Sequence, residues 1–147
     1  MNTTSSMLFP NATHMLDVIG GTAALGGDSD IIPRIRLGLP VSTIEFILGS
    51  GRLTLAELDR IVLPRKTLMN RRKLGSLTPE QSDRLVRVAR LIAAAEDTFG
   101  TAAKAHAWLR RPTAALAGEK PLELLDTDEG ARRVDNLLGR IGHGIAA

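Results

Sequence analysis

Apolar residues recur at helical spacing from Pro40 to the end of the chain. The longest stripe lies in about residues 79–98, and its successive members are three or four positions apart: Leu85, Val88, Ile92, Ala95 and Phe99. This period puts the members on one face of a long amphipathic helix. A second stripe, near the C-terminus, is formed by Val134, Leu137, Leu138, Ile141 and Ile145. The pattern predicts an all-α fold.

Polar residues mark where the expected helices begin. In a capping box, a hydroxyl accepts one backbone N–H and a Glu or Gln three residues later accepts another. Three pairs have this spacing: Ser42 with Glu45, Thr54 with Glu57, and Thr78 with Gln81. Pro64 suits the first turn of a helix that runs to about Lys73. Asp126 with Glu129 is expected to open the last helix, after a short helix at 101–109 and a turn at 122–125.

The first 38 residues are weakly patterned. Residues 1–12 are expected to be mobile and residues 13–38 to form an irregular lead-in, because glycine pairs interrupt a stretch of small residues. The alternation of residues 34–39, in which Ile35, Leu37 and Leu39 are apolar, permits a short strand. Pro33 and Pro40 leave little room for one. We therefore expect three parts, namely a lead-in at 1–38, a helical domain at 39–100 and a smaller helical domain at 101–147.

Composition excludes several classes of protein. The chain has no cysteine, which excludes a disulfide scaffold, a thiolate metal site and a cysteine nucleophile. Three Phe and one Trp are too few for an aromatic platform that stacks single-stranded nucleic acid. No apolar run approaches the roughly 20 residues of a membrane span, and no signal-peptide pattern opens the chain. We expect a cytoplasmic protein without contact to a membrane.

The sequence contains no recognisable set of catalytic residues. The three histidines, His14, His106 and His143, lie far apart, and none has an acid nearby at metal-ligand spacing. No phosphate-binding loop and no G-x-S-x-G elbow is present. Helix capping and the helix dipole account for the acids at residues 126–129. The sequence therefore predicts a protein that is not an enzyme and that holds neither a cofactor nor a metal.

Positive charge is concentrated in residues 60–73, a segment that contains six Lys and Arg residues. This basic segment follows another short helix after a tight connection, the layout of a helix-turn-helix whose second helix enters the major groove. Arg and Asn near the helix start suit base reading, and cations near its end suit phosphate contact. The expected DNA-binding residues are Arg65, Lys66, Thr67, Asn70, Arg71, Arg72 and Lys73. A solvated basic face is the alternative, favoured by Asp59 and by the absence of a glycine in the turn.

A familiar order of residues covers about 38–147. Residues 121–127 read PLELLDT, and after them come Gly130-Ala131, Val134, Leu137-Leu138, Arg140-Ile141 and Gly144. This order resembles the C-terminal domain of the Xre/MbcA/ParS antitoxins. Upstream, the residues similar to that family's helix-turn-helix domain and its continuation are Gly38-Leu39-Pro40, Pro64, Lys66-Thr67-Leu68, Arg71, Leu77-Thr78, Ser82–Leu85, Arg90, Phe99-Gly100, Ala107-Trp108-Leu109 and Pro112.

The resemblance implies an antitoxin of a type II toxin–antitoxin pair. Members of the family bind a RES-domain toxin that destroys NAD, and they place their last residues over the entrance to its active site. Their helix-turn-helix domain dimerises and, in many members, represses the shared promoter. The implied partners are thus a cognate RES-domain toxin, operator DNA and a second copy of the chain. The implied toxin contacts are Val134, Leu137, Leu138, Arg140, Ile141, Gly142, His143, Gly144 and Ile145.

Two other functions remain open at this stage. The chain could be a stand-alone helix-turn-helix regulator without a toxin partner, whose C-terminal domain serves only as a dimer interface. It could also be an antitoxin scaffold that no longer binds DNA, although the cations at Arg65, Lys66, Arg71 and Arg72 argue against this. The apolar stripe of the last helix distinguishes partner binding from packing within the chain, because Ile141 and Ile145 exceed what a short terminal helix can bury.

Overall fold

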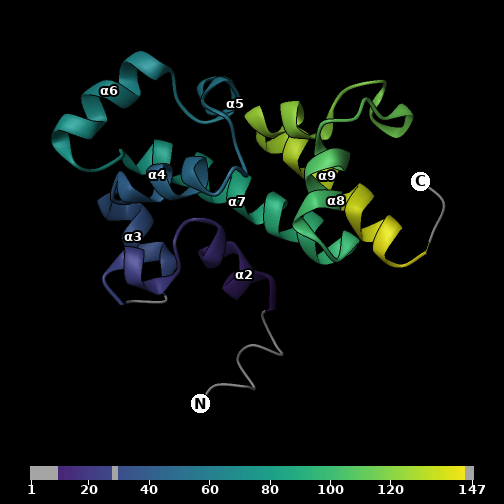
Figure 1. Ribbon diagram of the computed structural model, residues 1–147, viewed down its shortest axis with the longest axis horizontal. Coiled ribbons are helices and arrows are strands. Elements are labelled where there is room, and N and C mark those ends of the chain that lie inside the picture. Colours follow the sequence, from purple (N-terminus) through teal and green to yellow (C-terminus); the bar gives the residue numbers. More distant parts are fainter. Residues whose placement is uncertain (1–9, 28–29, 145–147) are drawn as a thin grey trace.

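Figure 1 shows the computed structural model, which describes residues 10–27 and 30–144. This part of the chain forms α-helices and short 3-10 helices and contains no strand, so the expected all-α fold is confirmed. The elements in chain order are α2 (Pro10–Val18), η1 (Thr22–Leu25), α3 (Ile31–Leu37), α4 (Ser42–Gly49), α5 (Leu55–Ile61), α6 (Arg65–Leu74), α7 (Pro79–Phe99), α8 (Ala102–Leu109), η2 (Ala114–Leu116), η3 (Pro121–Asp126) and α9 (Asp128–Gly142).

The longest helix, α7, is the element on which the others pack. It crosses the middle of the molecule, and α2, α8 and α9 lie against it (Figure 1). Its stripe is buried as the spacing predicts, with Leu85, Val88 and Ile92 at most 2% exposed. The predicted capping box starts the helix: the Thr78 hydroxyl accepts the N–H of Gln81 at 3.1 Å, and the Gln81 side chain accepts the N–H of Thr78 at 2.9 Å.

The N-terminal segment is helical and belongs to the core. Helix α2 packs on α7, and its Met15, Leu16 and Val18 are at most 8% exposed, while the following Ile19 is fully buried. The expectation of an irregular lead-in is therefore wrong here, and residues 10–12, expected to be mobile, form the first turn of α2. A nine-residue helix shows too few turns for a period, and tertiary packing stabilises it. Residues 1–9 lie outside the described part of the chain.

Helix α3 occupies most of the region where the alternation permitted a short strand, and no strand forms there. The Asp30 carboxylate accepts the N–H of Ile32 at 3.2 Å and caps the helix. Pro33 stands in the first turn, where its missing N–H removes no helical hydrogen bond. Helix α3 is only partly covered: Arg36 is exposed and Leu37 is 74% exposed, whereas Arg34 is half-buried.

Two of the expected caps are not formed. Val41, not Ser42, is the N-cap of α4, and Glu45 instead binds Arg72 of α6. A bidentate guanidinium contact is stronger than one backbone hydrogen bond, which explains the exchange. Thr127, not Asp126, caps α9 by accepting the N–H of Gly130 at 3.0 Å. The predicted box at Thr54 is present.

In residues 10–27 and 30–144, no helix is both long and apolar enough to span a membrane.

Candidate DNA-binding and toxin-binding surfaces

Helices α5 and α6 form the pair that the basic segment predicts. Val62 and Leu63, which connect them, are at most 3% exposed, so the turn is fixed by two buried side chains and needs no glycine. Asp59 Oδ1 accepts the N–H of Arg65 at 2.7 Å and satisfies one of the free amides at the start of α6. Asp59 and the glycine-free turn were the two features that favoured a merely solvated basic face. Both instead contribute to holding α6 in place.

The outward side of α6 is basic. Leu68 faces the core at 1% exposure and Thr67 is half-buried, while Lys66, Asn70 and Lys73 are exposed. Arg65 is also exposed, at the start of the helix. Within the described residues, no acid lies at ion-pair distance from Arg65, Lys66 or Lys73. These cations are therefore available to an external anion.

The other two arginines of α6 have partners within the chain. Arg71 Nε donates to the backbone oxygen of Ser76 at 2.8 Å and fixes the turn after the helix. Arg72 donates to both carboxylate oxygens of Glu45, at 2.7 and 3.1 Å, and joins α6 to α4. The hydrogen bond to Glu45 raises the pKa of Arg72. Both side chains thus position α6, and a DNA phosphate would have to share them with these partners.

The stripe of α9 is divided between the core and the surface. Val134, Leu137 and Leu138 are at most 2% exposed, so they hold α9 against the rest of the chain and are closed to direct toxin contact in this conformation. Ile141 is half-buried at the edge of the core. The exposed members of the expected toxin-binding set are Arg140, Gly142, His143 and Gly144. Ile145 lies outside the described residues.

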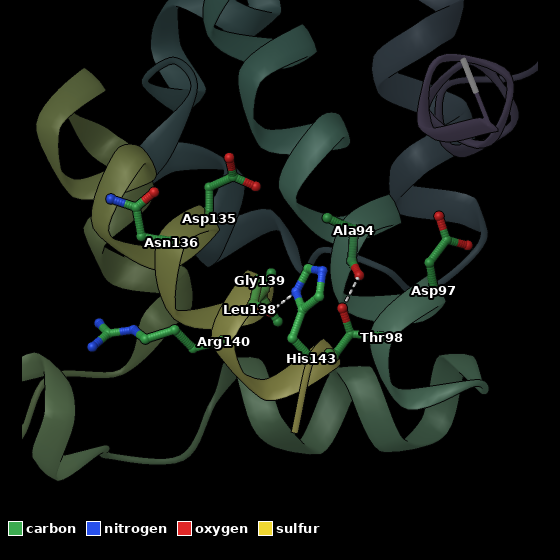
Figure 2. A pocket seen from close by; sticks show the side chains of 10 residues that line it. Ala94, Asp97, Thr98, Asp135, Asn136, Leu138, Gly139, Arg140 and His143 are labelled. Carbon is green, nitrogen blue, oxygen red and sulfur yellow. Dashed lines mark hydrogen bonds between the residues drawn. The ribbon is translucent and has the colours of Figure 1, made fainter. Parts of the chain in front are cut away.

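A hollow of about 680 Å³ opens between the C-terminal ends of α7 and α9 (Figure 2). We call it the α7–α9 hollow, and its lining residues are Ala94, Asp97, Thr98, Asp135, Asn136, Leu138, Gly139, Arg140, Gly142 and His143. The ring of His143 is fixed by a 2.6 Å contact between its Nδ1 and the Gly139 carbonyl oxygen. Because a carbonyl oxygen only accepts, Nδ1 carries the hydrogen, and Nε2 has no bonding partner within the described residues.

An ion-pair cluster beside the hollow joins three parts of the chain. Glu96 is 8% exposed and accepts two hydrogen bonds from Arg52, at 2.8 and 3.1 Å. His14 of α2 contacts Glu96 Oε1 at 2.9 Å and Asp97 Oδ1 at 2.7 Å. Burial opposes the charge of His14, but its bonds to Asp97 and Glu96 outweigh this and raise its pKa above 6.5. Burial likewise disfavours the ionised Glu96, but Arg52 and His14 lower its pKa below 4.5.

Sequence spacing missed this cluster. His14 lies 82 positions before Glu96, and its own segment was expected to be irregular, so no local signal paired them. The sole hint is the acidic pair Glu96-Asp97 near the end of an amphipathic helix, where acids oppose the helix dipole unless cations meet them. Within the described residues, no group of three or more His, Asp or Glu has a metal-site arrangement.

The basic helix pair is tied to the C-terminal part of the chain. Arg110, just after α8, donates to both oxygens of Glu57 in α5, at 2.8 and 2.9 Å. The same guanidinium donates to the backbone oxygen of Arg52 at 2.9 Å. Arg60 of α5 pairs with Glu123 of η3 at 3.1 Å. Burial raises the pKa of Glu57, but the bonds from Arg110 and Thr54 more than reverse this and lower it.

Comparisons with known proteins agree with this arrangement. Residues 30–90 match the antitoxin Xre-like helix-turn-helix domain, and residues 94–144 match the antitoxin Xre/MbcA/ParS C-terminal toxin-binding domain. Fold and matches together define an antitoxin-type protein in which a helix-turn-helix domain precedes a toxin-binding domain. The particular family is the Xre antitoxins, and the chain belongs to it, as the resemblance of its residues indicated.

Three relatives illustrate the similarity. The protein named antitoxin Xre in Pseudomonas putida is 36% identical over 121 residues, which are 82% of this chain and 76% of the relative. The antitoxin Xre of Yersinia enterocolitica is 36% identical over 118 residues, which are 78% of this chain and 80% of the relative. The Prs ADP-ribosylating antitoxin of a Sphingobium species is 35% identical over 80 residues, which are 48% of this chain and 50% of the relative.

Proposed function

We propose that this chain neutralises a RES-domain toxin that degrades NAD, and that it does so by covering the entrance to the toxin's active site. The observation that best supports this proposal is the match of residues 94–144 to a toxin-binding domain. In that domain the last turn of α9 is exposed, with Arg140, Gly142, His143 and Gly144 accessible to a partner. Val134, Leu137 and Leu138 then act indirectly, by holding α9 in place. Ile141 and Ile145 extend the proposed contact toward the chain end.

Co-expression tests this proposal. The adjacent open reading frame is induced in a bacterium with this chain, without it, or with a variant that lacks residues 140–147. The full chain is expected to restore growth, and the truncated variant is expected to fail while still repressing the promoter. Protection by the truncated variant would place the inhibitory contact elsewhere. A harmless neighbour, or harm that the full chain does not relieve, would contradict the proposal.

We further propose that residues 39–100 bind operator DNA as a homodimer in the bacterial cytoplasm and repress the operon. Arg65, Lys66, Thr67 and Asn70 lie within the first six residues of α6, toward the end with which a recognition helix contacts base edges. Lys73 is exposed and free to contact a phosphate. Arg71 would share its donors between a phosphate and Ser76, and Arg72 would share its donors between a phosphate and Glu45. The exposed basic side of α6 supports this part of the proposal.

A stand-alone regulator without a toxin partner is the second candidate. The burial of Val134, Leu137 and Leu138 favours it, because these residues are satisfied without any partner. The co-expression test separates the two candidates, since a stand-alone regulator would leave the harm of the neighbouring product unchanged while retaining DNA binding.

A further inference from the structure

The α7–α9 hollow lies entirely within the part of the chain that matches a toxin-binding domain. All ten of its lining residues fall between Ala94 and His143, inside the matched range 94–144. It also adjoins the exposed last turn of α9, since Arg140, Gly142 and His143 belong to both. A partner that covers the end of α9 would therefore meet the hollow as a continuation of the same surface.

The hollow offers free hydrogen-bond acceptors on Asp97, Asp135 and Thr98, while the side-chain donors of Asn136 and Arg140 also line it. Asp135 has no bonding partner among the described residues, and Asp97 uses only Oδ1, which contacts His14. His143 presents Nε2 once Nδ1 is bound to Gly139. Thr98 donates its hydroxyl hydrogen to the Ala94 oxygen at 2.8 Å, which leaves its lone pairs. A ligand that binds these acceptors has to bring donors.

Charge points the same way as the acceptors. Asp97 and Asp135 stand on either side of the hollow, around Ala94 (Figure 2). Arg140 also lines the hollow, but its side chain extends away from His143 and Asp97 (Figure 2), and no ion pair joins it to Asp97 or Asp135 within the described residues. Asp97 is partly balanced by its contact with His14, whereas Asp135 has no cationic partner within the described residues, so the Asp135 side of the hollow is complementary to a cationic donor.

Gly139 keeps the hollow open. Glycine is a poor residue for a helix interior, and its use usually has a packing reason. Gly130 has one, because a Cβ there would collide with the Leu124 carbonyl of η3. Gly139 has none within the described chain, since a Cβ at this position would meet nothing within 4 Å. Gly139 lines the hollow, so a side chain at this position would occupy space that is now open.

We propose that the α7–α9 hollow receives an arginine or lysine side chain of the toxin, which lies over Gly139 and donates to Asp135 and to the free oxygen of Asp97. This inference rests on the proposed function, because its ligand is part of the same toxin. It adds a contact surface and a chemistry for the partner, beyond the end of α9 that would cover the active-site entrance.

Two substitutions test the contact, with the purified product of the adjacent open reading frame as the probe. Gly139→Leu places a side chain where the toxin's cation would lie and is expected to weaken toxin binding at least tenfold. The same change should raise Tm by about 2 °C, because leucine is the better helix former. Asp135→Asn keeps the shape and removes one charge, and it should weaken binding about tenfold, with less salt dependence than the wild type.

Matched controls separate the hollow from the rest of the domain. Ala107→Leu adds the same side chain at an exposed position of α8, and Asp83→Asn removes an exposed acid from α7. Neither residue lines the hollow, and both variants are expected to bind the toxin as the wild type does.

The outcomes distinguish the inference from the proposed function. If the wild-type chain does not bind the toxin, the proposed function fails and the inference fails with it. If the wild type binds and Asp135→Asn binds equally well, the cationic occupant is wrong, whatever Gly139→Leu does to folding. If Gly139→Leu raises Tm and also binds normally, the hollow lies outside the interface.

Discussion

Single side chains decide how the basic helix is held. Asp59 looks unfavourable in a DNA-binding segment, yet its carboxylate accepts the N–H of Arg65 and acts as a cap supplied by the preceding helix. Pro64, the N-cap residue of α6, has no side chain that could accept this hydrogen bond. The acid is therefore explained by the backbone of α6 rather than by any chemistry of its own.

Asp59→Ala should lower the free energy of unfolding by about 1 kcal/mol, the typical cost of removing a helix cap. Urea unfolding of the two proteins measures this difference. Asp59→Asn is the matched control, since the amide oxygen can still accept the N–H of Arg65, and it should lose less than half as much. Equal losses in both variants would show that the charge, not the hydrogen bond, matters.

His14 should make stability depend on pH near neutrality. Its folded pKa lies above 6.5, so the imidazolium contacts with Asp97 and Glu96 stabilise the protein fully below that value. This stability is lost as the pH rises through the raised folded pKa. The urea midpoint of the wild type is therefore expected to be lower at pH 8.5 than at pH 6.

The control for this prediction is His14→Gln, which cannot titrate and should have a nearly constant midpoint over the same interval. Glu96 does not confuse the result, because its pKa is lowered and its contribution is lost only in acid, below its ordinary value of 4.5. A wild-type midpoint that does not change between the two pH values would contradict the role assigned to His14.

At the scale of whole elements, the sequence predicts best those helices that carry their own start, stop and period. Helix α7 has a capping box, a stripe of several turns and a terminal glycine, and it begins at the expected Pro79 and ends at Phe99. Helix α2 is followed by Gly20 and Gly21 but has neither a capping box nor a stripe of several turns, and it packs on the apolar face that α7 offers. Short helices of this kind depend on contacts that are distant in sequence, which local patterns do not contain.

The exposed basic side of α6 should contribute to DNA affinity through contacts with DNA phosphates. Lys66→Ala and Lys73→Ala are each expected to weaken binding to the operon's promoter DNA and to reduce the salt dependence by about one counterion. Titrations of labelled promoter DNA at several salt concentrations measure both effects. Arg133→Ala, an exposed cation on α9, is the control and should leave the slope unchanged. Unchanged slopes in all three variants would exclude α6 as the DNA-facing helix.

At the scale of the whole molecule, the two matched domains are not independent. Arg110 and Glu57 belong to different domains and are 53 positions apart, yet their side chains form a bidentate pair at 2.8 and 2.9 Å. The α7–α9 hollow likewise exists only when both helices are docked. The basic helix could be predicted because its residues are consecutive. These two features could not, because each depends on the packing of distant segments.

Arg110→Met should lower the free energy of unfolding by about 2 kcal/mol, since it leaves Glu57 half-buried without its charged donor. Arg111→Met is the adjacent control on an exposed residue and should stay within about 0.5 kcal/mol of the wild type. The pKa of Glu57 is lowered in the folded protein, so its contribution is present above 4.5 and lost as the pH falls through the folded value. The loss of unfolding free energy at acidic pH should therefore be smaller in Arg110→Met. An unchanged loss would contradict the pairing of Arg110 with Glu57.

Neutralisation of a toxin is the central claim, and NAD consumption measures it most directly. Purified product of the adjacent open reading frame is incubated with NAD while this chain is added in increasing amounts. We expect the toxin alone to consume NAD and consumption to stop when a fixed molar ratio of this chain to the toxin is reached. Consumption that continues at saturating amounts of the chain, or a neighbouring product without effect on NAD, would contradict it.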